Sequence, residues 1–244
     1  HEIINLLNVN GRVAVPDLSR RFGVTEDCIR KDLKQLVAEG KCKRVYGGAT
    51  RADGIIELAV RDRMDLFKPE KQLVAQKALA LISRNDTVYL DISTTNVLLA
   101  KLIAGAQLAC TVVTPMVDIL LAAAESPSVT VICPGGQMSG VLNGMTGQMA
   151  AEALDRFRFD LGFLGAYGVD ADNCEVTTHD APDGLMKRMA LERSSRRYVL
   201  CESRKLGAVG NYCYASFDDF DALICDDRDE ANIARVREAG LEVL

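Results

Sequence analysis

The sequence predicts an α/β protein, with an N-terminal winged helix-turn-helix followed by a Rossmann-like, mostly parallel α/β domain. Three observations support this prediction. Helix, turn, helix and hairpin patterns follow one another in the first 51 residues. From residue 87 onward, short apolar runs alternate with helix patterns, which is typical of a parallel sheet wrapped by helices. The first 51 residues are basic, whereas the rest of the chain is acidic.

The charge difference between the two parts is large. Residues 1–51 contain 10 Lys and Arg against 6 Asp and Glu, a net charge of +4. Residues 52–244 contain 19 against 28, a net charge of −9, which brings the whole chain to −5. A basic segment on an acidic body predicts a polyanionic partner for the basic segment alone.

The composition argues against several classes of protein. Hydrophobic residues make up 48% of the chain and charged residues 26%, which are ordinary globular values. No apolar run approaches the ~18 residues of a membrane span and no signal-peptide pattern is present, so we expect a cytoplasmic protein. The eight cysteines include no C-x-x-C pair, and we expect reduced structural thiols. Two histidines are too few for a His-based metal site, and we expect neither metal nor cofactor.

The chain starts at His1 inside an apolar periodic segment, so we expect the natural chain to begin earlier.

The first 40 residues contain three predicted helices. Ile3 and Leu7 mark the apolar face of the first, which ends at Gly11. Pro16 suits the start of the second, which Gly23 ends. Thr25 caps the third helix, and residues 41–49 then follow as a basic hairpin.

This order is that of a winged helix-turn-helix, whose third helix enters the major groove while its wing contacts phosphates or the minor groove. The candidate contacts to double-stranded operator DNA are Thr25, Asp27, Cys28, Arg30, Lys31, Lys34, Lys43, Arg44 and Tyr46. A solvated helix face is the competing interpretation of a basic helix, but the four features in the correct order favour DNA binding.

We divide the chain into residues 1–51 as the DNA-binding domain, 52–70 as a linker and 71–244 as the effector-sensing domain. The linker region carries Arg61, and Lys71 follows the proline of the next predicted helix. These charges either transmit the effector signal or are solvated on a helix surface.

The remainder alternates between predicted strands and helices. The expected strands are 87–91, 110–114, 129–133, 160–166, 197–201, 222–226 and 241–244. The expected helices are 95–104, 115–124, 147–157, 181–194 and 229–239. In such sheets, ligands bind beyond the carboxyl ends of the strands. Polar and glycine residues gather at those ends, which predicts one pocket.

The stretch from Thr87 to Thr95 shows this arrangement most clearly. A buried strand pattern ends in Asp91, the hydroxyl residues Ser93, Thr94 and Thr95 follow, and a helix begins. The unpaired N–H groups of a helix N-terminus form a ready anion site. We therefore expect this turn to hold the phosphate of a small metabolite.

Both parts resemble the DeoR family of bacterial repressors. In the head, Arg30-Lys31-Asp32-Leu33 and Tyr46-Gly47-Gly48-Ala49 are similar to that family's DNA-binding motifs. In the body, similar blocks occur in the same order: 91–95, Pro134-Gly135-Gly136, 165–168, 177–178 and 202–207. The resemblance implies a body related in fold to ribose-phosphate isomerase that senses a phosphorylated sugar or similar metabolite.

Four positions depart from the family pattern. Lys31 replaces an arginine, so a bidentate contact becomes a point-charge contact. Ser93 stands at the usual glycine of the phosphate turn, Pro115 at a usual asparagine and Glu202 at a usual aspartate. The three departures in the body, Ser93, Pro115 and Glu202, predict an unusual effector or weaker ligand binding.

The candidate effector-binding residues are Asp91, Ser93, Thr94, Thr95, Gly135, Gly136, Gly165 and Lys205. Thr94 and Thr95 donate to phosphate in this hypothesis, although Thr95 could instead cap the helix. Asp91 would accept from sugar hydroxyls or orient the turn. Lys205 would offer a positive charge, with a surface lysine as the alternative.

Lys187 and Arg188 are further candidates on a predicted helix. The His179-Asp180 pair is interpreted as a loop, because no nucleophile lies near it in the sequence.

The leading functional hypothesis is a metabolite-responsive transcriptional repressor of a carbohydrate-metabolism operon, working as a homodimer or homotetramer. The alternative is an isomerase- or transferase-like enzyme on the same body fold. A DNA-binding head is hard to explain in such an enzyme. A thiol switch through Cys28 or Cys42 has little support in the sequence.

Overall fold

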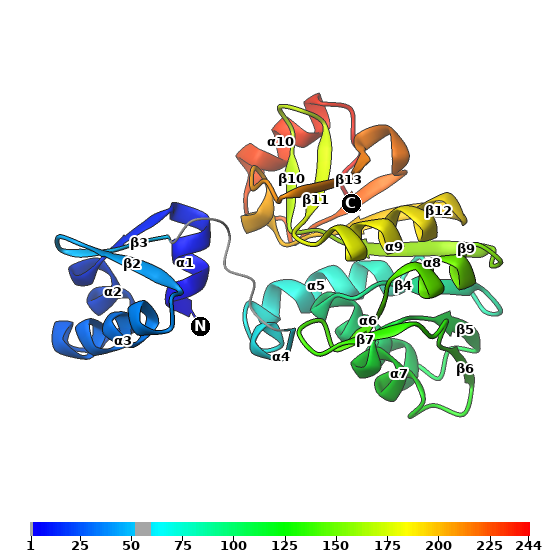
Figure 1. Cartoon of the computed structure of the whole chain (residues 1–244). Helices are drawn as coiled ribbons and strands as arrows, with labels where there is room; N and C mark the ends of the chain where they lie inside the picture. The colour runs from blue at the N-terminus through cyan, green and yellow to red at the C-terminus, as the bar shows by residue number, and fades with distance from the viewer. Residues whose placement is uncertain (1, 52–59) are drawn as a thin grey trace. The chain divides into compact units, whose positions relative to one another are not determined.

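A computed structural model of the chain describes residues 2–51 and 60–244 (Figure 1). The chain separates into two compact units, residues 1–58 and residues 59–244. Of the predicted linker, residues 52–59 lie outside the described part, and residues 60–70 belong to the second unit. We refer to the first unit as the head and to the second as the body.

The head is a three-helix unit with a small antiparallel sheet, in the strand order β1-β3-β2. Its elements are α1 (Glu2–Asn10), β1 (Arg12–Ala14), α2 (Val15–Phe22), α3 (Glu26–Ala38), β2 (Cys42–Val45) and β3 (Gly48–Arg51). The predicted breaks fall where expected, because Gly11, Gly23 and Gly40 all adopt positive φ at the ends of helices. Leu7, Leu18 and Leu33 are almost fully buried at the centre and fix the three helices to one another.

The body is built on a six-stranded sheet in the order β14-β12-β9-β4-β5-β6, and every adjacent pair is parallel. The strands are β4 (Thr87–Leu90), β5 (Cys110–Val113), β6 (Val129–Ile132), β9 (Phe159–Gly165), β12 (Ser194–Leu200) and β14 (Ala222–Ile224). The prediction of a mostly parallel α/β domain is confirmed. Strands β4, β5, β9 and β14 are buried over most of their length, which explains their nearly continuous apolar sequences, whereas the first half of β12 is polar and only partly buried.

Helices cover both faces of this sheet. They are α4 (Val60–Arg63), α5 (Lys68–Leu79), α6 (Thr94–Gly105), α7 (Val117–Ala123), α8 (Gln148–Leu154), α9 (Ala181–Glu192) and α10 (Glu230–Glu238). Helices α5, α6 and α7 share one apolar core with the sheet, whereas α8 and α9 pack with Tyr89 and Phe159 in another. Within the described ranges, no helix is long and apolar enough to cross a membrane.

Two small antiparallel sheets were not predicted. One contains β10 (Gly168–Asp170), β11 (Glu175–Thr178) and β13 (Tyr212–Ser216), and the other is the hairpin of β7 (Gln137–Ser139) and β8 (Gly144–Thr146). These strands have only three to five residues, and they lie in stretches for which no strand was predicted. Strands of this length are too short to show an alternating apolar pattern in the sequence. Two short 3₁₀ turns, η1 (Ser203–Lys205) and η2 (Phe217–Asp219), complete the body.

The strand predicted at residues 241–244 is wrong as a regular strand. Residues 242–244 share backbone hydrogen bonds with Leu223 and Cys225, but the pairing amounts to a single isolated parallel bridge between Val243 and Leu223 of β14. Leu241 and Val243 are nevertheless buried, so the apolar pattern recorded burial at the sheet edge rather than a full strand.

Candidate functional site

Helix α3 presents one face to the core of the head and one to solvent. The Thr25 hydroxyl accepts from the backbone N–H of Cys28 at 3.4 Å and caps the helix as predicted. Ile29 and Leu33 are buried, whereas Arg30 and the two lysines that follow it in the helix are exposed. The basic face of α3 is therefore available to a large polyanion.

Arg30 is oriented by two neighbouring carboxylates. Its guanidinium lies 2.6 Å from Glu26 Oε2 and 2.9 Å from Asp27 Oδ1, both one turn earlier in α3. Such exposed pairs contribute little to stability. They hold the side chain along the helix surface and place its charge toward the N-terminal end, which is the end that contacts bases in helix-turn-helix proteins.

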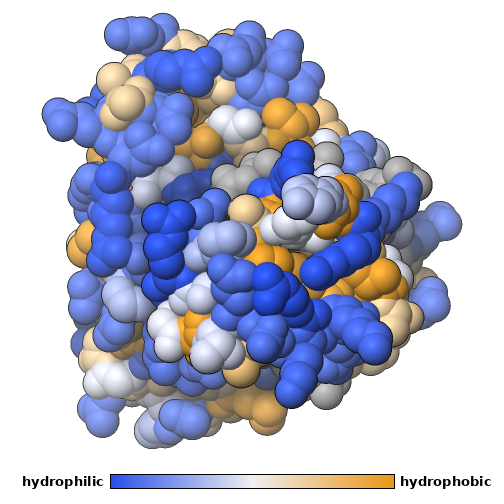
Figure 2. All heavy atoms as spheres, turned by 90° about the vertical axis from the view of Figure 1, so that its left-hand side faces the viewer, coloured by the Kyte–Doolittle hydropathy of each residue, from blue (hydrophilic) through white to orange (hydrophobic). Residues whose placement is uncertain are grey.

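A basic hollow lies between α3 and the wing. Arg30, Lys34 and Val37 from α3 and Arg44 from β2 line a cavity of ≈ 330 Å³. Tyr46 at the tip of the wing is 99% exposed, which is unusual for so large an aromatic ring and suits contact with a partner. Hydrophilic side chains cover most of the face shown in Figure 2, and apolar side chains form small scattered patches there. In the head itself, the exposed side chains of Arg30, Lys34, Arg44 and Tyr46 fit a polar, positively charged interface.

The remaining candidates for DNA contact lie in the same two elements. Thr25, Asp27, Cys28 and Lys31 belong to the cap and exposed surface of α3, and Lys43 is exposed on β2. The fold thus places all nine predicted contacts on α3 and the adjoining wing.

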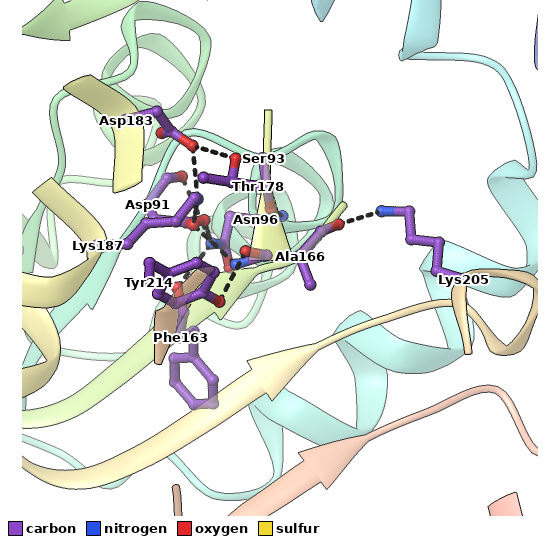
Figure 3. A network of polar contacts seen from close by, with 11 residues as sticks. Asp91, Ser93, Asn96, Phe163, Ala166, Thr178, Asp183, Lys187, Lys205 and Tyr214 are labelled. Carbon is purple, nitrogen blue, oxygen red and sulfur yellow. Dashed lines mark hydrogen bonds and ion pairs between the residues drawn. The ribbon is translucent and has the colours of Figure 1, made fainter. Parts of the chain in front are cut away.

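In the body, Asp91 is the centre of a buried polar network at the carboxyl end of β4 (Figure 3). Its carboxylate accepts from Asn96 Nδ2 at 2.6 Å and from the Gly165 N–H at 2.7 Å, and it forms an ion pair with Lys187. These donors occupy the directions in which a carboxylate accepts hydrogen bonds. Asp91 therefore orients the strand-end turn, which was one of the two roles predicted for it.

Lys187 is the main buried cation of this network, and the sequence offered only weak support for it. It projects from α9 and is 3% exposed, with Asp91 on one side and Asp183 Oδ2 at 3.5 Å on the other. Burial alone would lower the pKa of Lys187, but the two carboxylates raise it. Burial also raises the pKa of Asp183, whose Oδ2 accepts from the Thr178 hydroxyl at 2.8 Å.

The turn after Asp91 forms the N-terminus of α6. The Ser93 hydroxyl, not that of Thr95, caps the helix by accepting from the Asn96 N–H at 3.1 Å. The N–H groups of Thr94 and Thr95 stand in the first turn, where no partner exists inside the helix. Both threonines are largely buried, so a ligand reaching them would be shielded from water.

Two of the predicted glycines have packing reasons of their own. A Cβ at Gly165 would lie 2.7 Å from the Cβ of Ser93, and a Cβ at Gly136 would lie 2.7 Å from that of Ala150. Gly136 also has a φ of +124°, and Gly135 beside it has a φ of +79°. Close packing and turn geometry account for Gly136 and Gly165 without a ligand.

A second buried carboxylate, Glu202, lies just beyond the end of β12. It is fully buried, with Lys205 Nζ at 2.8 Å, Arg204 Nη2 at 3.6 Å and Lys71 Nζ at 4.0 Å. Burial alone would raise the pKa of Glu202, but these three cations lower it well below the ordinary value. We call Glu202, Lys71, Arg204 and Lys205 the Glu202 cluster.

Lys205 links this cluster to the end of β9. Its Nζ donates to the Ala166 carbonyl at 2.9 Å, while the Tyr214 hydroxyl donates to the preceding Gly165 carbonyl at 3.1 Å. Figure 3 shows Lys205 reaching Ala166 from the side opposite to the Asp91 network. The segment at the end of β9 is thus fixed from both sides.

Lys71 is buried in the first turn of α5 at 2% exposure. Its Nζ donates at 2.6 Å to the carbonyl of Arg63, the last residue of α4. Burial lowers the pKa of Lys71 to about 7, since Glu202 only partly offsets the burial and the cations Lys205, Arg204 and Arg63 lower it further. Lys71 is therefore not a solvated surface charge, and the side chain of Arg61 lies outside the described residues.

His179 lies near the same cations. Its ring packs against that of Tyr167 at an interplanar angle of 50°, with centroids 3.7 Å apart, in the loop before α9. Burial, with Arg63 and Lys205, lowers the pKa of His179 to about 4, so the ring is neutral at pH 7. This supports the interpretation of the His179-Asp180 pair as part of a loop.

The cysteines are all free thiols. Burial raises the pKa of Cys110 and Cys225 to about 11 and raises that of Cys42, which makes these thiols poor nucleophiles.

Comparison with known proteins decides the family. The DeoR-like helix-turn-helix domain matches residues 1–54, and the DeoR C-terminal sensor domain matches residues 67–227.

The chain belongs to the DeoR family.

Among curated relatives, the HTH-type transcriptional regulator GolR of Listeria innocua is 29% identical over 100% of this chain and 96% of the relative. The lactose phosphotransferase system repressor of Streptococcus mutans is 28% identical over 96% and 94%. A D-ribose-5-phosphate isomerase structure covers 55% of this chain and 52% of that chain, with a TM-score of 0.41 and 19% identity. DeoR-family proteins are DNA-binding regulators, so the enzyme alternative is set aside.

Within this DeoR-family body, sequence patterns indicated Lys187 and Lys71 only weakly, and Asp183 and Asn96 not at all, as members of polar networks. Each lies in a helix, where a single charge or amide reads as a surface residue. One signal was present for two of them: Asp183 and Lys187 are four residues apart and so share one helix face.

Proposed function

We propose that this chain represses an operon of carbohydrate metabolism and that a phosphorylated sugar or related metabolite regulates its binding to operator DNA. One observation carries the proposal: the same chain contains two different units. The head has an exposed basic recognition helix, and the sensor body has a buried polar site at its strand ends. The repressor named among the relatives, which regulates a lactose phosphotransferase system, supports the sugar-related part.

In the head, α3 enters the major groove and the wing contacts the DNA backbone. Arg30, Lys31 and Lys34 supply the positive charge of the helix, and Lys43 and Arg44 that of the wing. Thr25, Asp27 and Cys28 lie at the end of the helix that meets base edges. Tyr46 contacts the sugar-phosphate backbone with its exposed ring.

In the body, Thr94 and Thr95 donate backbone and hydroxyl hydrogen bonds to the phosphate of the effector, and Lys205 supplies a positive charge. Asp91 and Ser93 hold the turn in place through their contacts with Asn96. Gly135, Gly136 and Gly165 let the backbone come close to the ligand, in addition to the packing and turn geometry that Gly136 and Gly165 already serve.

The head works in pairs, because operators of helix-turn-helix repressors mirror the two-fold symmetry of the protein. We therefore propose a homodimer or homotetramer. Light scattering of the protein bound to a single operator checks this, and one monomer bound per operator would contradict it.

A gel shift on DNA from the upstream region of the protein's own operon tests the function. Salt-sensitive binding that changes on addition of one of a panel of phosphorylated sugars is the expected result. Failure to bind any promoter region of the locus at low salt would refute the repressor. Binding that ignores every phosphorylated sugar would refute the sensing.

A further inference from the structure

We propose that the Glu202 cluster is an anion-receiving site and that Lys71 transmits its occupancy to α4, the element that follows the connection to the head. This inference rests on the proposed function, because Lys205 belongs both to the proposed effector site and to this cluster, and it adds the first step of the signal. The cluster lies at the carboxyl edge of the sheet, where ligands of such folds bind.

The charge balance of the cluster favours an added anion. One carboxylate, that of Glu202, faces three cations. The side chains of Lys71, Arg204 and Lys205, taken without their backbone atoms, are 3%, 30% and 18% exposed. Buried cations in excess of their counter-charges are costly, and a bound anion reduces that cost. The partial exposure of Arg204 and Lys205 gives the anion a route of entry.

Glu202 is also held differently from Asp91. Asp91 accepts directional hydrogen bonds from Asn96 and Gly165 in addition to its ion pair with Lys187. Neither oxygen of Glu202 accepts a well-directed hydrogen bond from the described residues, although Lys205 lies 2.8 Å away. The oxygens of Asp91 are thus occupied by directed donors, whereas the Glu202 carboxylate is held mainly by the charge of its neighbours, so these cations can be shared with a ligand.

Two cations of the cluster also hold the turn between α4 and α5. Lys71 donates to the Arg63 carbonyl at the end of α4, at 2.6 Å. The Arg204 guanidinium lies 4.0 Å from the ring centroid of Phe67, which precedes α5 with a φ of +55°. A non-glycine residue in this left-handed conformation is strained and persists only where its surroundings hold it.

An anion that attracts Lys71 and Arg204 therefore removes the contacts that keep this turn in place. Lys71 leaves the Arg63 carbonyl, and Arg204 leaves the face of Phe67. Helix α4 begins at Val60, directly after residues 52–59, so a change in its position reaches the head through a short covalent path. The cluster thus couples ligand charge to the start of the connection to the DNA-binding unit.

The test uses the full chain and inorganic sulfate, which keeps two negative charges across the neutral range and stands in for a phosphate group. Thermal unfolding is followed with increasing sodium sulfate against sodium chloride of equal ionic strength. The variants are Lys71→Met, Arg204→Gln and the control Lys77→Met, whose lysine lies in the same helix but pairs with Asp227. Binding to fluorescent upstream DNA is measured for each protein in both salts.

We expect sulfate to raise the melting temperature of the wild type and of Lys77→Met by about 2–4 °C or more beyond chloride. The half-saturating sulfate concentration should rise about tenfold in Lys71→Met and Arg204→Gln. The sulfate-dependent change in DNA affinity should disappear in Lys71→Met. Equal sulfate stabilisation of all four proteins, or none in the wild type, would overturn the site. An unchanged sulfate effect on the DNA affinity of Lys71→Met would overturn the coupling.

If the proposed repressor function is wrong, the DNA-binding measurements show it separately from the melting temperatures. A chain that binds no upstream DNA in either salt refutes the repressor, while the melting temperatures still decide whether the cluster receives anions.

Discussion

Replacing Lys71 by methionine should stabilise the protein, and the gain should depend on pH. Methionine keeps the length of the side chain and removes a charge that is 2% exposed. Burial lowers the pKa of Lys71 from 10.5 to about 7, and each tenfold loss of proton affinity is worth ~1.4 kcal/mol, so the buried charge costs ~5 kcal/mol at low pH. Loss of the hydrogen bond to the Arg63 carbonyl offsets ~1 kcal/mol of this. The expected gain at about pH 6 is therefore ~4 kcal/mol.

The sign of the pH dependence follows from the two states of the chain. In the unfolded chain Lys71 stays protonated up to its ordinary pKa of 10.5, whereas the folded chain releases the proton above about 7. Between these values the unfolded state binds more protons, so the wild type gains stability as pH rises. The advantage of Lys71→Met over the wild type should then shrink by ~3 kcal/mol between about pH 6 and about pH 9.

Urea unfolding followed by circular dichroism at the two pH values measures this difference, and Lys77→Met is the matched control. Equal m-values ensure that the same surface is exposed in each protein. An advantage of Lys71→Met that is the same at both pH values would refute the reasoning, because the folded protein would then hold Lys71 with an ordinary proton affinity.

Further predictions address the head and the sensor site. Arg30→Ala should weaken operator binding and lower the slope of log affinity against log salt by ~1, measured by titration at several salt concentrations; an unchanged slope would remove Arg30 from the interface. Thr94→Val should abolish the response to effector in gel shifts while DNA binding persists, and a normal response would mean that the phosphate turn is misassigned. Gly165→Ala should cost ~1–3 kcal/mol in urea unfolding, because the new Cβ would meet that of Ser93 at 2.7 Å. Adding Ser93→Gly should recover most of this loss, and no recovery would locate the clash elsewhere. The pKa of His179 falls from 6.5 to about 4, so the unfolded chain takes up its proton at higher pH than the folded chain does. The wild type should therefore lose ~1–2 kcal/mol as pH falls through this range, less than the full shift implies because the ring is partly exposed. His179→Gln should lack this part of the acid sensitivity, and an identical acid profile would contradict it.

The head was predictable because its signals are local. Thr25 caps its helix through a hydroxyl three residues from the N–H it accepts, and Gly11, Gly23 and Gly40 end helices through their own backbone conformation. None of these interactions requires a distant partner. Strands β4, β5 and β9 were predictable for a related reason, since burial on both faces leaves a nearly continuous apolar run, whereas the polar first half of β12 was missed.

The two carboxylates at the strand ends show where local reasoning stopped. Asp91 looked like a ligand contact, yet Asn96, Gly165 and Lys187 occupy its oxygens, and Lys187 is 96 residues away in sequence. Glu202 looked like a conservative change of a family residue, yet it is the buried centre of three cations. Whether a charged side chain is solvated or buried depends on which helix covers it. The packing of the helices on the sheet decides this, and the local sequence does not show it.

By itself the sequence determined the two-part organisation, the recognition helix, the parallel sheet and the edge of that sheet at which the polar residues gather. Apolar periodicity, helix caps and turn residues specify these features, and each of these signals comes from residues that are close together in the sequence. Only the tertiary structure decided that Ser93 is a helix cap, that Lys187 neutralises Asp91 and that Lys71 joins α4 to Glu202. The physical reason is that the energy of a buried charge depends on its partners, and the fold draws those partners from distant parts of the chain.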